Sequence, residues 1–127
     1  MRTKLLFLAS VLLAGSVPVL AHHAFAAEYD SKASMSVTGV ITKVEWTNPH
    51  TYVYMDVTDD GGKVSNWAFE GYPPNTLKRT GFTRDLIKVG DKIGMTAWKA
   101  KDGVNRGAGR EITLPDGKKI FLGPNAQ

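Results

Sequence analysis

Apolar and polar residues alternate along much of the chain, which is the pattern of half-buried β-strands. The alternation is clearest over residues 50–57, where one face carries Thr51, Val53, Met55 and Val57. Residues 35–47 carry apolar side chains on both faces, which predicts a longer strand that bends around a barrel, and Gly39 would allow a bulge or a sharp coil there. Asn48-Pro49 ends this strand because proline cannot donate to a β-ladder. The first two predicted strands therefore meet at a corner over residues 45–50.

The remaining pattern predicts a small barrel. Further strands are expected over residues 63–70, 92–99, 110–114 and 118–122. Two prolines and a closing Gly81 predict a short helix over residues 73–81, and the glycine-rich residues 103–110 are interpreted as a flexible turn. Three strands, a helix and two strands with an extension form the element order of an OB-fold. We therefore predict an all-β domain with one short helix, a small OB-fold-like Greek-key barrel; an SH3-like barrel or a small sandwich is the alternative.

The first 21 residues have the layout of a secretory signal peptide: a basic start, an apolar run and compact residues at Val19-Leu20-Ala21. Gly15, Ser16 and Pro18 interrupt the apolar run, which is shorter than the roughly 20 residues that span a bilayer. We expect cleavage after Ala21 and a periplasmic or secreted protein without a transmembrane anchor. The expected parts are a signal peptide (1–21), a lead-in (22–34), the OB-like barrel (35–122) and a loose tail (123–127), with Phe25 and Tyr29 pinning the lead-in to the barrel.

The composition of the chain excludes several classes of function. The chain has 127 residues, enough for one domain, and no cysteine, which excludes disulfides, thiolate metal sites and a cysteine nucleophile. Cleavage would remove Arg2 and Lys4 and leave 14 basic against 12 acidic residues, a net charge of +2. Because these charges are scattered, we expect no nucleic-acid partner. No spacing indicates a catalytic set, so we assign no catalytic residues and expect a binding module rather than an enzyme.

Several blocks carry a resemblance to a known family. They are His22-His23-x-Phe25, Glu28-Tyr29-Asp30, residues 39–50 with Glu-Trp-Thr-Asn-Pro-His at their end, Asn66-Trp67-Ala68-Phe69-Glu70, Gly90-Asp91, Lys101-Asp102-Gly103 and Leu114-Pro115-Asp116-Gly117. In these blocks the chain resembles a family of small exported bacterial proteins known as a domain of unknown function. The resemblance implies export and a single small β-domain, and it supplies no activity.

All three histidines, His22, His23 and His50, lie in the two most distinctive blocks. Imidazole is the commonest side-chain metal ligand. Cleavage after Ala21 would place an α-amino group beside the His22 imidazole, and His50 would complete a three-nitrogen set that favours Cu(II), with His23 as an alternative or additional ligand. This arrangement is similar to the N-terminal histidine motif of exported copper-binding proteins and copper oxygenases. The simpler interpretation is a soluble terminus and a hydrogen-bonded turn histidine.

Acidic and aromatic residues extend the metal-site hypothesis and supply an alternative to it. The expected second shell, which would orient the imidazole rings, consists of Glu28, Asp30, Glu45 and Asn48. The alternative function is metal-free binding of a small ligand or another exported protein on an exposed aromatic face that includes Trp46, Tyr52, Tyr54 and Trp67; the same aromatic residues could instead form the core. A small copper enzyme is the remote alternative. The methionines at 35, 55 and 95 are interpreted as core residues.

Overall fold

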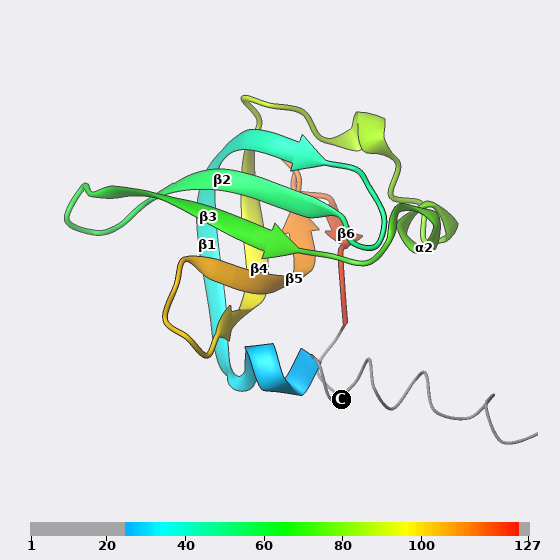
Figure 1. Ribbon diagram of the computed structural model, residues 1–127. Helices are drawn as coiled ribbons and strands as arrows, with labels where there is room; N and C mark the ends of the chain where they lie inside the picture. Colours follow the sequence, from blue (N-terminus) through cyan, green and yellow to red (C-terminus); the bar gives the residue numbers. More distant parts are fainter. Residues whose placement is uncertain (1–24, 125–127) are drawn as a thin grey trace, which may run out of the picture.

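The computed structural model describes residues 25–124, which form six strands and short helical segments (Figure 1). A single helical turn at residues 25–28 leads directly into the first strand. The elements that follow are β1 (Tyr29–Glu45), β2 (Tyr52–Thr58), β3 (Val64–Glu70), α2 (Pro74–Arg79), η1 (Arg84–Leu86), β4 (Lys92–Ala100), β5 (Arg106–Thr113) and β6 (Lys119–Phe121). This order confirms the prediction of three strands, a short helix and two strands with a terminal extension.

The strands form one sheet that closes on itself. Their order is β3-β2-β1-β4-β5-β6. A parallel pairing of β3 with β5 closes the first five strands into a ring, and β6 pairs with the other edge of β5. All other pairs are antiparallel. The 17-residue β1 serves both halves, because it pairs with β4 along its first part and with β2 along its second part. The fold is therefore mostly antiparallel β-sheet in a closed, barrel-like ring, as the alternating pattern predicts.

Apolar side chains from all parts of the ring fill its interior. The alternation over the second strand is confirmed, since Val53 and Met55 are fully buried while Tyr52 and Tyr54 between them are partly exposed. Leu77 of α2 joins the same core. The fully or almost fully buried members also include Ile41, Phe69, Phe82, Ile93, Met95, Ile112 and Leu122. Met35 is partly buried and packs against this core, so the interpretation of the three methionines is confirmed.

The first strand differs from its predicted form. It begins at Tyr29 rather than at residue 35, because the segment before Met35 is drawn onto β4 through pairs such as Tyr29 with Ala100. The register shift against β2 lies between Ile41 and Lys43 and not at Gly39. Gly39 has another role: a Cβ there would lie 2.3 Å from the backbone oxygen of Asp56. Glycine therefore allows two strands to approach closely at this position.

The glycine-rich stretch is also different from the prediction. Residues 106–110 are not a flexible turn but the start of β5, where Gly107 and Gly109 are buried. A Cβ at Gly107 would lie 3.1 Å from the Phe69 ring, and one at Gly109 would lie 2.4 Å from Leu122. The strand thus needs glycine because large apolar side chains fill the space beside it.

The start of the expected tail is docked, since the buried Gly123 donates its backbone N–H to the Arg110 carbonyl. Residues 125–127 and the expected signal peptide lie outside the described range. Within residues 25–124, no helix is long and apolar enough to cross a membrane.

Candidate functional site

A row of polar side chains crosses the outer surface of the barrel. Glu45 on β1 pairs with Tyr52 on β2, and Tyr52 pairs with Glu70 on β3. The neighbouring positions Val53 and Phe69 are fully buried in the core. Because side chains alternate between the two faces of a strand, this row lies on the outer face.

Glu70 is the centre of a polar cluster at one end of this row. One carboxylate oxygen, Oε1, lies 2.6 Å from Nδ1 of His50, and the other, Oε2, accepts a hydrogen bond of 2.5 Å from the Tyr29 hydroxyl. The side chain of Glu70 is 16% exposed and that of His50 is 45% exposed. A proton between Nδ1 and Oε1 avoids the repulsion of two acceptor atoms at this distance, and a proton on Nδ1 matches the ion pair of an imidazole with a carboxylate. Glu70 therefore orients the His50 ring and leaves Nε2 as its second nitrogen.

Two tyrosines surround the Glu70 carboxylate. Burial raises the pKa of Tyr29 above its usual range, and the hydrogen bond to Glu70 and the negative charge of that group raise it further. Burial likewise raises the pKa of Tyr52, with the charge of Glu70 and a hydrogen bond to it as the next causes. Both hydroxyls consequently stay protonated at neutral pH and can donate to Glu70.

Tyr29 belongs to a small apolar cluster outside the barrel. Its other buried members are Trp98, Ala100 and Ala108, with Phe25 packed against them. Phe25 lies 5.4 Å from the rings of both Tyr29 and Trp98, measured between ring centroids. The expectation that Phe25 and Tyr29 attach the lead-in to the barrel is therefore confirmed.

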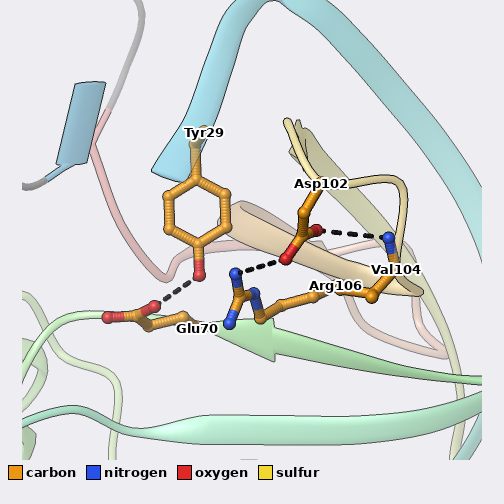
Figure 2. A network of polar contacts seen from close by, with 5 residues as sticks. All are labelled: Tyr29, Glu70, Asp102, Val104 and Arg106. Atoms are coloured by element: carbon orange, nitrogen blue, oxygen red, sulfur yellow. Dashed lines mark hydrogen bonds and ion pairs between the residues drawn. The ribbon is translucent and has the colours of Figure 1, made fainter. Parts of the chain in front are cut away.

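Arg106 and Asp102 enclose the same tyrosine from the β4–β5 side (Figure 2). The Arg106 guanidinium lies 5.7 Å from the centre of the Tyr29 ring and pairs with Asp102 at 3.3 Å. Asp102 also accepts the backbone N–H of Val104 at 3.2 Å, which holds the turn that carries it. The positive charge of Arg106 acts against the rise in the pKa of Tyr29, although burial and Glu70 dominate.

The residues proposed as a second shell are dispersed. Glu45 pairs with Lys43 at 2.6 Å. Asp30 accepts the backbone N–H of Lys32, and Glu28 is exposed. In residues 25–124, the carboxylate that contacts His50 is Glu70 instead.

Asn48 is exposed at the corner and precedes Pro49 through a cis peptide bond. The sequence-based prediction assigns Glu70 no role at this site. The available signal was weak: Glu70 ends a predicted strand, and its alternation places it on the same face as Ala68 and opposite to Phe69. Nothing in the local pattern indicated that Tyr29, 41 positions away, would be its partner.

The proposed metal ligands are only partly described. His50 is exposed at the corner, whereas His22 and His23 lie outside the described residues. Between residues 25 and 124, no three side chains of histidine, aspartate or glutamate form a group suited to a metal ion. His50 alone therefore represents the proposed ligand set in the described part of the chain.

The proposed aromatic face is divided between two environments. Tyr52 and Tyr54 lie together on β2, with ring centroids 6.2 Å apart. Trp46 packs edge-on against Phe82 at 5.3 Å, and Trp67 packs against the core. The structure therefore brings the two tyrosines together and separates them from the two tryptophans.

A shallow groove of about 490 Å³ lies over β1, β4 and β5. Polar side chains around it include Ser36, Thr38, Thr96 and Thr113. Gly94 also lines the groove and lies on β4, between β1 and β5. This groove shares no residue with the Glu70 cluster. The candidate site therefore consists of Glu70 and its contacts and lies apart from the groove.

Comparison with known proteins identifies the family of this chain. A family of unknown function, DUF6152, matches residues 9–110. A search of curated proteins gives no match.

Proposed function

The chain belongs to the DUF6152 family of unknown function. From the geometry of the Glu70 cluster we propose that the protein is an exported binding module that holds copper and is built on an OB-like barrel. The proposed ligands are His50 and the terminal His22, with His23 as an alternative or additional ligand. The Glu70 carboxylate takes the second-shell role.

The contact between His50 and Glu70 carries this proposal. A histidine that binds a metal through one ring nitrogen commonly donates the other N–H to a carboxylate, which fixes the tautomer and makes the ligand more basic. Here Nδ1 lies 2.6 Å from Glu70 Oε1 while nearly half of the imidazole remains exposed. This arrangement favours Nε2 as the ligand atom.

The docked Phe25 supports a meeting of the two histidine blocks. Only three residue steps separate His22 from Phe25, and three extended residues reach about 10 Å. Phe25 contacts Tyr29, whose hydroxyl bonds to the carboxylate that also contacts His50. The attachment point of the terminal segment is thus two side chains from His50.

The donor set favours copper. A free α-amino group and the imidazole of His22 could chelate one ion, and His50 would add a third nitrogen; a nitrogen-rich donor set of this kind suits Cu(II). Glu70 adds negative charge next to the incoming cation, whereas the nearby Arg106 is paired with Asp102. The charge distribution around His50 therefore favours a cation.

Titration of the chain that begins at His22 with Cu(II) tests the proposal. We expect one ion per chain, and weaker binding in His50→Ala and in a chain extended by alanine before His22. Glu70→Gln removes the charge of the orienting group and should weaken binding by about 10–100-fold. Glu45→Gln is the matched control, since Glu45 lies on the same outer row but pairs with Lys43. Equal affinity of the unchanged, His50→Ala and extended chains would exclude the shared site.

One observation favours a metal-free function as the second candidate. Tyr52 and Tyr54 are adjacent on the outer face, and the Lys43 ammonium lies 5.2 Å from the Tyr54 ring centre. Such a patch suits a planar ligand that stacks on the tyrosine rings. Loss of ligand binding in Tyr54→Ala with unchanged Cu(II) affinity would separate this function from the metal site.

A further inference from the structure

We infer that docking of the N-terminal segment, residues 25–29, positions the His50 ring through Tyr29 and Glu70. Tyr29 and Glu70 are then positioning residues, and the lead-in is a structural part of the site rather than only a carrier of His22. The position of the ring is a property of the protein without metal. Its consequence for the affinity for copper rests on the proposed function.

The segment is held to the barrel by contacts of several kinds. Phe25 packs on Trp98 at 5.4 Å. The backbone N–H of Lys101 donates to the Glu28 carbonyl at 2.9 Å, and the Lys101 ammonium donates to the Ala26 carbonyl. Tyr29 itself is only 3% exposed. The segment therefore docks as a unit, and the Tyr29 hydroxyl has a fixed position when it does so.

The fixed hydroxyl determines the position of the carboxylate. Tyr29 donates to Glu70 Oε2, while Glu70 Oε1 contacts Nδ1 of His50. Exposure increases along this path, from a buried tyrosine through a carboxylate that is 16% exposed to a histidine that is 45% exposed. The barrel core cannot hold so exposed an imidazole by packing. In the described residues, Glu70 is the acidic partner of the ring. Tyr52 lies beside the same carboxylate on the outer face, so loss of the Tyr29 bond removes the buried one of its two tyrosine donors and loosens the position of His50.

The coupling is reciprocal by thermodynamic necessity. If docking favours the ring orientation that binds an ion through Nε2, an ion at Nε2 favours docking by the same factor. Docking of residues 25–29 and binding of an ion at His50 would then stabilise each other.

Nitrogen-15 NMR of the His50 ring, without metal, tests the positioning directly. At a pH where the imidazole is neutral, the unchanged chain should show a single tautomer with the proton on Nδ1. Tyr29→Phe removes the hydroxyl but keeps the ring, and Phe25→Ala weakens docking at a distance; both should give a mixture of tautomers. Tyr54→Phe is the matched control, a hydroxyl removed from the same outer face without a bond to Glu70, and should leave the tautomer unchanged.

Hydrogen exchange at the Lys101 amide reports docking, because this amide donates to Glu28. Faster exchange in Phe25→Ala together with mixed tautomers supports the coupling. An unchanged Nδ1–H tautomer in Tyr29→Phe overturns it, as does an unchanged tautomer in a Phe25→Ala chain whose Lys101 amide exchanges freely.

Cu(II) titration of the same variants separates this inference from the proposed function. We expect Tyr29→Phe to lose about tenfold in affinity, at the lower limit for second-shell changes, and Tyr54→Phe to lose none. If the unchanged chain binds no copper but Tyr29→Phe still alters the tautomer, the proposed function fails and the positioning stands. If His50→Ala weakens binding while Tyr29→Phe alters neither tautomer nor affinity, the positioning fails and the proposed function stands.

Discussion

Replacement of Tyr29 by phenylalanine gives a stability prediction whose pH dependence follows from the structure. The change removes one hydroxyl and keeps the ring that packs against Phe25. Hydrogen bonds to charged groups contribute about 1.5–3 kcal/mol. Because Glu70 is 16% exposed and water can partly replace the lost donor, we expect a loss of about 2 kcal/mol in the free energy of unfolding at neutral pH.

The difference between the two proteins should shrink in alkali. In the unfolded chain Tyr29 ionises near its usual pKa of 10.0, whereas in the folded protein burial and Glu70 raise the pKa well above that value. Above pH 10.0 the unfolded state therefore binds fewer protons, and the stability that Tyr29 provides, fully present below this pH, is progressively lost. The total loss between neutral pH and roughly pH 11, one unit above the pKa of the unfolded state, amounts to about 1.4 kcal/mol. Phenylalanine cannot ionise, so the variant lacks this term.

Urea unfolding followed by tryptophan fluorescence measures both free energies, provided that the dependence on urea is the same in the two proteins. The other tyrosines titrate in both chains, so the difference isolates Tyr29. The gap should fall from about 2 to about 0.5 kcal/mol between neutral pH and roughly pH 11. A gap that stays constant or widens over this range would refute the reasoning, because it would mean that Tyr29 is no harder to ionise in the folded state.

Two further predictions concern the barrel itself. Gly39→Ala should cost about 1–3 kcal/mol in urea unfolding, because its Cβ would lie 2.3 Å from the backbone oxygen of Asp56; Gly61→Ala, whose nearest neighbour would be a side-chain atom at 3.4 Å, should change stability by less than about 0.5 kcal/mol. Equal effects would show that the strands separate easily at Gly39. Leu77→Ala should cost about 2–5 kcal/mol, since this α2 side chain is fully buried in the core; Val89→Ala, at a position 63% exposed, is its control and should be nearly neutral. A small loss in Leu77→Ala would mean that α2 does not seal the core.

The candidate site was less predictable than the fold. His50 could be selected because a proline corner presents it, and it is exposed there. Glu70 could not be selected over Glu45, since both lie on outer-facing positions of predicted strands and their roles differ only through their neighbours, His50 and Lys43. Tyr29 was assigned to a lead-in because its own strand has no clear alternation. What distinguishes these residues is pairing between distant segments, which a local pattern does not contain.

The sequence by itself determined the order of elements, the inward positions of β2 and the short helix, because periodicity, proline and glycine act over a few neighbouring residues. The tertiary structure decided the rest. The pairing of β3 with β5 that closes the ring makes residues 106–110 part of a strand. This strand contains glycine because the side chains of Phe69 and Leu122 occupy the space beside it. The same closure, with the docking of β1 on β4, brought Tyr29 to Glu70 across 41 positions. Such contacts depend on strand register around the whole barrel, and register is a property of the assembled sheet.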